Sequence, residues 1–389
     1  MLKKIMEDQV MKIVHCCLSN YYIDDYNYQE NLLPIFNQKN GNQVLIVAST
    51  ETFLENKKLG YVKAGKFKTK EGIDLVRLDY SKLLPRIIMK KIRLYKGLKR
   101  ILTEFDPDVI LFHGLPAFEL INVANYKKNN SRVKFYLDSH EDYHNSGRNL
   151  LSKYILHRLL YRSVIKLTKR YFDCVYYISL ETKKFIEENY RYFGKSLFLP
   201  LGGEVLSDSE YNSKRDRFRN KYNIGKDEIV FFHSGKLDKS KKTIELLSSY
   251  IQSKTSSRLF IAGSVSEDIK LEFNNLVSIS KSIVFLGWLN SAEISDAFCG
   301  SDIYLQPGTQ SVSMQQALCS RCVAALYPYS SHEFLLGDDY LRIENASDMY
   351  KLFVDIGSGK YDLNSIRIKV HSIALDILDY NKQSKMYLK

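Results

Sequence analysis

Residues 229–250 read IVFFHSGKLDKSKKTIELLSSY: an apolar run, then a glycine with several lysines, then a helical pattern. The run at 229–234 is short and rich in strand-forming residues, and the apolar residues after Thr243 have helical spacing. A strand that passes through a glycine turn into a helix is the repeating unit of a parallel α/β sheet. This stretch therefore predicts a doubly wound α/β unit.

The same alternation recurs along all 389 residues. In the first half we expect strands at 12–17, 43–48, 73–78, 109–113, 134–138, 174–179 and 195–200, and in the second half at 229–234, 257–262, 283–286, 303–306 and 321–326. The proline and paired glycines of Leu199–Glu204 mark a boundary between the halves. The fold class is α/β, with two Rossmann-like, doubly wound domains facing a central cleft.

We therefore expect an N-terminal domain at 1–203, a second domain at 204–370 and a C-terminal helix at 371–389 that packs back on the first domain. The composition excludes a disordered chain, because 45% of residues are hydrophobic and 26% are charged. The net charge is +13. Residues 1–200 hold 34 basic and 21 acidic residues, so the rest of the chain, with 23 of each, is neutral. This asymmetry predicts that the first half faces a polyanion.

Two segments, 81–100 and 152–170, carry fourteen lysines and arginines and no acid. The apolar residues of 81–100 keep near-helical spacing, so we expect them to face the core and leave the surface to the cations. Such a surface suits anionic lipid headgroups. An ordinary solvated face is the alternative. Nucleic acid is a weaker one, because no helix-turn-helix, zinc finger or RNA-binding signature is present.

The sequence predicts a cytoplasmic protein, because it shows neither a signal-peptide core nor a run of about 18 apolar residues. Its six cysteines have no disulfide-framework spacing, and the lone Cys319-Ser-Arg-Cys322 lacks a second ligand pair for zinc. Five of the six lie in apolar contexts that predict buried thiols, and we interpret Cys319 and Cys322 as structural cysteines.

Two strand ends in the second half predict an anion-binding pocket. After 229–234, Gly235 allows a sharp turn, and Lys236 with Lys241 or Lys242 then projects at the strand end, suited to a diphosphate. After 303–306, Pro307 and Gly308 end the strand. Thr309 or Ser311 is expected to cap the next helix, whose opening amides near Gly308 to Val312 face the same pocket. Together these features predict a site for a nucleoside diphosphate.

The sequence resembles the GT-B nucleotide-sugar glycosyltransferases, particularly glycosyltransferase family 4 of the polysaccharide, O-antigen and capsule type, over nearly its whole length. The segments that carry the resemblance are Gly235-Lys-Leu through Lys241, Phe260–Gly263, Val284–Trp288, Ser301–Pro307 and Gln316–Val323. By this resemblance Gly235, Lys236 and Lys241 hold the donor diphosphate, Gln316 the ribose hydroxyls, and the loop residues Gly308, Thr309, Gln310, Ser311 and Val312 complete the donor site.

The sequence also departs from the family pattern. Gln316 stands where the family has the second of two glutamates, and the first glutamate has no clear counterpart. The loop that follows Pro307 is also shorter than in the family, so we expect Gln310 to contact the sugar. Glutamine bonds hydroxyls but brings no charge and cannot act as a base. Lys236 replaces an arginine, which exchanges a bidentate fork for a point charge.

The first half resembles the acceptor domain of the same enzymes, through Tyr26–Pro34 and Asp106–Ile110. The resemblance implies that His140 lies near the reacting sugar as the catalytic candidate. It also assigns Tyr26, Tyr28 and Glu30 to the acceptor, with a turn or cap role as the alternative for Glu30. His113 ends another strand, where it could line the acceptor side; a structural role is the alternative and the one we favour. His15, inside its strand, is expected to be a core histidine.

The resemblance thus implies a retaining hexosyltransferase with no cofactor and a nucleotide diphosphate sugar as co-substrate, and we expect the transfer to be metal-independent. Its acceptor would be a lipid-linked or growing glycan at the inner face of the cell membrane, in cell-surface polysaccharide synthesis. The lysines neutralise the diphosphate in place of a metal, since no Asp-x-Asp occurs in a suitable loop. A catalytically silent scaffold of the same fold is the alternative, and a nucleotide-sugar epimerase is a weaker one.

Overall fold

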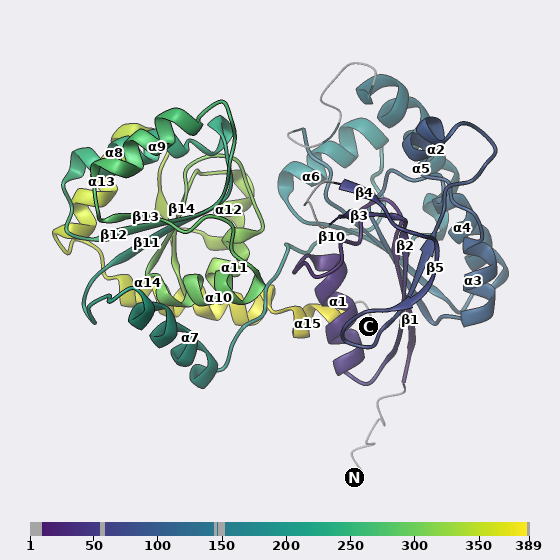
Figure 1. Cartoon of the computed structure of the whole chain (residues 1–389). Helices are drawn as coiled ribbons and strands as arrows, with labels where there is room; N and C mark the ends of the chain where they lie inside the picture. Colours follow the sequence, from purple (N-terminus) through teal and green to yellow (C-terminus); the bar gives the residue numbers. More distant parts are fainter. Residues whose placement is uncertain (1–9, 55–58, 144–145, 147–151, 387–389) are drawn as a thin grey trace, which may run out of the picture. The chain divides into compact units, whose positions relative to one another are not determined.

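The structure is a computed structural model that describes residues 10–54, 59–143, 146 and 152–386. The chain divides into two compact units (Figure 1). Unit 1 comprises Met1–Pro200 together with Tyr380–Lys389, and unit 2 comprises Leu201–Asp379. The C-terminal residues from Tyr380 onward therefore group with the first unit rather than with the second.

Unit 1 is built on an eight-stranded sheet with the order β10-β9-β8-β7-β1-β2-β6-β5. Its strands are β1 (Lys12–Cys17), β2 (Gln43–Ser49), β5 (Gly65–Lys68), β6 (Asp74–Leu78), β7 (Val109–His113), β8 (Lys134–Ser139), β9 (Cys174–Tyr177) and β10 (Ser196–Phe198). All pairs are parallel except β5 with β6. The order reverses direction between β1 and β7, and ligands of doubly wound sheets bind at the carboxyl ends of strands at such a point.

Helices cover both faces of this sheet (Figure 1). On one face Leu33 and Phe36 of α1 (Gln29–Lys39) and Tyr380 of α15 (Tyr380–Met386) share a core cluster with Ile13 and Leu111. On the other face α3 (Leu98–Phe105), α4 (Leu120–Asn129) and α5 (Arg162–Thr168) pack on the alternate strand residues. The remaining elements are α2 (Arg86–Ile92), η1 (Ser152–Tyr161), η2 (Lys169–Tyr171), α6 (Leu180–Phe185), η3 (Ile186–Tyr190) and the hairpin β3 (Glu51–Phe53) with β4 (Leu59–Tyr61).

Unit 2 has six strands in the order β13-β12-β11-β14-β15-β16, with every pair parallel. The strands are β11 (Val230–Leu237), β12 (Arg258–Val265), β13 (Ile283–Phe285), β14 (Ile303–Gln306), β15 (Val323–Leu326) and β16 (Leu341–Arg342). In chain order within the unit this is 3-2-1-4-5-6, the strand order of a Rossmann sheet, and its switch point lies between β11 and β14.

The helices of unit 2 are α7 (Asp208–Lys221), η4 (Lys239–Lys241), α8 (Thr243–Ser253), α9 (Lys270–Ile279), α10 (Ser291–Gly300), α11 (Ser313–Cys319), α12 (Ser330–Leu336), α13 (Ala346–Gly357), α14 (Leu363–Ile373) and η5 (Ala374–Leu378). Figure 1 shows α8, α9 and α13 on one face of the sheet and α7, α10 and α14 on the other. Both units are therefore doubly wound, which confirms the predicted fold class of the two domains.

All twelve expected strands are present, three of them with the expected bounds: β1, β7 and β14. Four strands were not expected from the sequence: β3, β4, β5 and β16, which have two to four residues each. Among the described residues, no helix has the length and apolarity needed to cross a bilayer.

Candidate functional site

The site in unit 2 begins where β11 and β14 end side by side. Two glycines allow the backbone segments there to approach closely. A side chain on Gly263 of β12 would place its Cβ 1.8 Å from the carbonyl oxygen of Gly235, and one on Gly308 would place it 2.2 Å from the carbonyl oxygen of Ser240. The Gly308 contact brings the β14 loop against the segment that follows β11, so the two strand ends predicted to bind an anion lie together.

The two lysines expected at the diphosphate have different environments. Lys236 is exposed near the end of β11. Lys241 is buried, and its Nζ donates to the carbonyl oxygens of Thr309 at 2.5 Å and Gln310 at 3.1 Å. Burial lowers the pKa of Lys241 to about 8, although Asp238 acts in the opposite direction. Lys241 thus ties down the loop that carries Thr309 and Gln310, and Lys236 is the exposed cation; a direct diphosphate contact for either stays a prediction.

Lys242, the alternative to Lys241, turns away from this loop. Its Nζ donates to the carbonyl oxygen of Glu344 at 2.9 Å and lies 4.9 Å from the centre of the Tyr327 ring. Its backbone is in the left-handed region, with φ of 53°. The side chain therefore serves a packing contact on another part of unit 2.

The expected helix cap after β14 is wrong. The N-cap residue of α11 is Val312, no side chain caps the helix, and Ser311 Oγ instead donates to Gln306 Oε1 at 2.7 Å. Thr309 Oγ1 lies 3.4 Å from Ser240 Oγ. The loop from Gly308 to Val312 is consequently held by side-chain bonds to the β14 end and by Lys241, rather than by a cap of its own helix.

The polar side chains beneath this loop were not among the residues expected at the site from the sequence. Ser234 and Gln306 are buried in β11 and at the end of β14, and within the described part of the chain Ser234 Oγ and Gln306 Nε2 have no hydrogen-bond partner. Tyr304 OH lies between them, 3.5 Å from the Ser234 carbonyl oxygen and 3.4 Å from Gln306 Oε1. The only sequence feature that could have indicated Ser234 and Gln306 is that each is a polar residue near the end of an apolar strand. Gln316, expected at the ribose, is half-buried in α11.

In unit 1, the catalytic candidate His140 directly follows β8. Its Nε2 lies 3.3 Å from Asp138 Oδ1, and Asp138 is fully buried. Burial alone would lower the pKa of His140, but the Asp138 carboxylate outweighs it, with help from Glu30 and Glu141, and raises the pKa to about 9. His140 is therefore an imidazolium at neutral pH. Glu30, expected near the acceptor, is buried in the first turn of α1 and acts on this histidine.

The expectation that His113 lines the acceptor side is wrong. The side chain of His113 is 0% exposed. Its Nδ1 lies 2.5 Å from Asp138 Oδ2 and its Nε2 3.1 Å from His15 Nδ1, so both ring nitrogens are occupied inside the unit. His15 is also 0% exposed, as expected of a core histidine.

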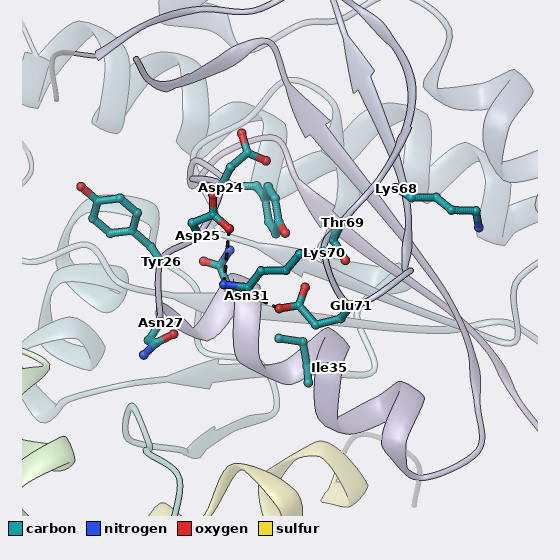
Figure 2. Close-up of a pocket in the computed structure, with 11 residues that line it drawn as sticks. Asp24, Asp25, Tyr26, Asn27, Asn31, Ile35, Lys68, Thr69, Lys70 and Glu71 are labelled. Atoms are coloured by element: carbon teal, nitrogen blue, oxygen red, sulfur yellow. Dashed lines mark ion pairs between the residues drawn. The ribbon is translucent and has the colours of Figure 1, made fainter. Parts of the chain in front are cut away.

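A pocket of about 230 Å³ lies beside the start of α1, and its lining comes from two segments, residues 22–35 and 68–71 (Figure 2). Its lining residues are Tyr22, Asp24, Asp25, Tyr26, Asn27, Asn31, Ile35, Lys68, Thr69, Lys70 and Glu71. Figure 2 shows Lys70 extending between Asp25 and Glu71, with its Nζ 3.3 Å from Asp25 Oδ1. Asp24 is held by Arg77 at 2.6 Å.

Of the tyrosines expected at the acceptor, Tyr26 lines this pocket and Tyr28 does not. The two rings lie 5.2 Å apart, and Tyr28 is exposed at the N-cap of α1. Both carboxylate and hydroxyl side chains line this polar pocket. Such a lining suits a ligand that is rich in hydroxyl groups. Sequence reasoning missed the contribution of residues 68–71, because a hairpin that had not been expected brings them there.

The two basic segments differ from expectation in their apolar residues. In 81–100, Leu83 and Ile87 are 77% and 74% exposed, and Leu84 and Ile88 are also exposed. The expected burial of Leu84, Ile87 and Ile88 is therefore wrong, because α2 packs on unit 1 mainly through Met89. In 152–170 the exposed apolar residues are Tyr154, Ile155, Leu159 and Leu167. Tyr161 OH donates to the Lys91 carbonyl oxygen, so the two segments adjoin.

All six cysteines are free and buried. Burial raises the pKa of the Cys319 and Cys322 thiols, which keeps them protonated. Within the described ranges, no three or more His, Cys, Asp or Glu side chains are grouped to hold a metal ion.

No protein-family model matches the sequence, and the search of curated proteins also gives no match. Solved structures are similar over nearly the whole chain. A glycosyltransferase from Rickettsia africae has a TM-score of 0.65 at 12% identity, covering 98% of this chain and 99% of its own. HepE from Anabaena in complex with UDP has a TM-score of 0.65 at 12% identity, covering 97% and 99%.

WaaG, a glycosyltransferase involved in lipopolysaccharide biosynthesis, has a TM-score of 0.62 at 12% identity, covering 96% of this chain and 99% of its own. At such identities the likeness concerns the fold. This chain has the GT-B fold that these glycosyltransferases share.

Proposed function

We propose that this protein is a glycosyltransferase of the family 4 type that moves a hexose from a nucleotide diphosphate sugar to a glycan hydroxyl. The observation that carries the proposal is the switch point of unit 2. There, glycine-dependent close approach joins two strand ends, with an exposed lysine and unpartnered polar groups beside them. The similarity to HepE, whose complexes contain UDP and UDP-glucose, supports a nucleotide sugar as donor.

In the proposed mechanism Lys236 stabilises the negative charge that develops on the leaving diphosphate as the glycosidic bond breaks. Such preorganised charge typically lowers a barrier by several kcal/mol. The Lys241 bonds to Thr309 and Gln310 fix the loop that contacts the sugar. Gln316 bonds the ribose hydroxyls. The lysine supplies the charge that a metal would otherwise supply, so we propose metal-independent transfer, with retention of the anomeric configuration by analogy to the family.

His140 is the proposed group of unit 1 beside the reacting sugar. As an imidazolium at neutral pH it can donate a hydrogen bond to a sugar hydroxyl. Glu30 and the pocket with Tyr26 are the proposed contacts for acceptor hydroxyls. A carboxylate accepts hydrogen bonds from hydroxyls, which is the recognition that a sugar acceptor needs.

We further propose that the acceptor is lipid-linked and that unit 1 rests on the anionic, cytoplasmic face of the cell membrane. The exposed leucines and isoleucines of α2 and η1, surrounded by acid-free cation runs, support this part of the proposal. Apolar side chains that enter the headgroup boundary and cations that attract anionic lipid act together in interfacial helices. A role in cell-surface polysaccharide synthesis follows from such an acceptor.

Isothermal titration calorimetry with the diphosphates of uridine, guanosine, cytidine and adenosine tests the donor half. We expect one of the four to bind with a dissociation constant in the micromolar to millimolar range, a typical range for nucleotide sites. Failure of all four to bind would refute the proposal. Binding without turnover of the corresponding nucleotide sugars would instead favour a silent scaffold, the alternative that Gln316 in place of a glutamate supports.

A further inference from the structure

A chain of buried polar groups crosses unit 1 on the α1 face of its sheet, behind His140. Asp138 Oδ2 lies 2.5 Å from His113 Nδ1, His113 Nε2 lies 3.1 Å from His15 Nδ1, and His15 Nε2 lies 3.0 Å from Asn37 Oδ1. Asn37 Nδ2 donates to the backbone carbonyl oxygen of Ser384 at 2.9 Å. The chain therefore runs from the catalytic candidate through three strands and α1 to the C-terminal helix α15.

The carbonyl of Ser384 sets the direction of the chain. A backbone carbonyl can only accept a hydrogen bond, so the amide nitrogen of Asn37 must face it and the amide oxygen must face His15. An amide oxygen also only accepts, and His15 Nε2 must then carry a hydrogen. The position of α15 consequently determines which nitrogen of a buried histidine is protonated.

Counting hydrogens along the chain shows that one proton more is required than two neutral imidazoles supply. The three contacts among Asp138, His113, His15 and Asn37 each need one hydrogen. Two neutral histidines bring two. With a buried polar group left unsatisfied at a cost of about 1–3 kcal/mol, the network favours taking up a third proton.

The surroundings decide where that proton resides. Asp138 also accepts from the Gly114 N–H at 3.0 Å and lies beside the His140 cation. Burial alone would raise the pKa of Asp138, but the neighbouring His113 and His140 hold it below its usual range. The His140 contact and the Gly114 N–H bond do not depend on the state of His113, and both favour an ionised carboxyl. Burial, with His113, lowers the pKa of His15 to about 3, so His15 is not the cation. His113 remains.

We propose that His113 is a buried imidazolium held between Asp138 and His15, and that it positions His140 through the carboxylate of Asp138 that both histidines share. The titratable groups around the pair are His15 on β1, Asp138 on β8, Glu141 after β8 and Glu30 on α1. The Asp138 carboxylate lies against both histidines. His113 and His15 are thus positioning residues, and the consequence for catalysis rests on the proposed function.

Histidine-selective ¹⁵N NMR of the full chain tests the proton inventory without any activity assay. The His113 signals, assigned by comparison with His113→Gln, should show two protonated ring nitrogens at pH 7.5. A single protonated nitrogen on His113 would overturn the proposal. The assignment is tractable because the chain contains eight histidines.

Asn37→Ala breaks the link to α15, so His15 can donate through Nδ1 and His113 should lose its extra proton at pH 7.5. The matched control is Asn40→Ala, which removes a 3.0 Å bond from Asn40 Nδ2 to Ser384 Oγ. This variant leaves the hydrogen bonds from Asp138 to Asn37 and Ser384 intact. It should leave the His113 signals unchanged. His15→Phe serves as a second variant, because it retains ring stacking on His113 and removes the acceptor nitrogen. If His113 kept two protonated ring nitrogens in both Asn37→Ala and His15→Phe, the proposal would be contradicted.

The catalytic consequence has a separate readout. Loss of the His113 cation strengthens the hold of Asp138 on the His140 proton, so the alkaline limb of kcat/KM should move up by at least about half a pH unit in Asn37→Ala. Asn40→Ala should keep the wild-type profile. If the wild-type protein turns over no nucleotide sugar, the proposed function fails, while the NMR result still decides the state of His113. An unshifted limb with a shifted NMR signature would refute the positioning role alone.

Discussion

Lys236 and Lys239 are two exposed lysines of the segment that follows the buried part of β11, and they form a matched pair. Lys236 lies at the switch point, whereas Lys239 pairs with Asp268 at 3.8 Å. We expect Lys236→Ala to weaken binding of the preferred nucleoside diphosphate about tenfold or more, since a charge-assisted bond contributes about 1.5–3 kcal/mol. Calorimetry should show no comparable loss for Lys239→Ala. If both variants lost the same affinity for the nucleoside diphosphate, general surface charge would explain the effect and a specific contact of Lys236 would be contradicted.

The raised pKa of His140 predicts a pH-dependent contribution to stability. Its folded-state pKa of about 9 exceeds the ordinary value of 6.5, so the folded protein binds the proton more tightly. The stabilisation is fully present below pH 6.5 and disappears as the pH rises through 9. Urea unfolding of wild type and His140→Gln should differ by on the order of 2 kcal/mol more at pH 6 than at pH 9.5. A pH-independent difference would contradict the His140–Asp138 interaction.

Several residue-level features were predictable from sequence, and others were not. The buried cysteines and the core position of His15 followed from their apolar contexts. His113 was misassigned because a histidine at the end of a strand reads the same whether it points to a ligand or into the sheet. Ser234 and Gln306 were missed because burial without a partner is a property of the packed loop above them, not of their sequence neighbours.

Among the elements, the ends of β11 and β12 are fixed by a close approach that only glycine permits. Gly263→Ala would bring a Cβ to 1.8 Å from the Gly235 carbonyl oxygen, at a φ of +136°. We expect a loss of more than about 3 kcal/mol in the free energy of unfolding. Gly287→Ala, at φ of +66° with nothing near its Cβ, isolates the backbone strain and should cost about 1 kcal/mol. Similar losses in the two variants would show that the close approach is not rigid.

The exposed apolar residues of the basic segments predict membrane binding. The double variant Leu83→Ser with Ile87→Ser should abolish most flotation with anionic vesicles, since each buried leucine or isoleucine contributes about 1.5–3 kcal/mol. Leu271→Ser, at a site 78% exposed in α9 of unit 2, is the matched control and should float like wild type. Flotation should also fall at high salt. Binding that survives both the double variant and high salt would exclude this surface.

The strands of the two sheets were predictable because a buried parallel strand is a continuous apolar run, and β1, β7 and β14 were located with their exact bounds. The short strands β3, β4, β5 and β16 are edge elements or hairpin pieces with little apolar signal. The exposed apolar residues of α2 were wrongly expected to be buried, for a related reason. Helical spacing reveals that an apolar face exists, but it does not reveal whether the face meets the core or the surroundings.

At the scale of the whole molecule, strand order is what brings the functional residues together. His15, His113 and Asp138 are separated by up to 123 positions, yet β1, β7 and β8 are neighbours in the sheet and align them on one face. No local pattern in the sequence contains that order. The same holds for Gly263 and Gly235, which meet because β11 and β12 pair in parallel register. The sequence therefore predicted the candidate groups more reliably than their partners.

The most direct test of the account is release of a nucleoside diphosphate from nucleotide sugars, followed by mass spectrometry, for wild type and Lys236→Ala side by side. We predict that wild type releases the diphosphate from one donor with transfer of its sugar to a glycan acceptor, and that Lys236→Ala slows release at least tenfold. Lys239→Ala should match wild type. Absence of release from every uridine, guanosine, cytidine and adenosine donor, or release that is unaffected by Lys236→Ala, would contradict the central claim.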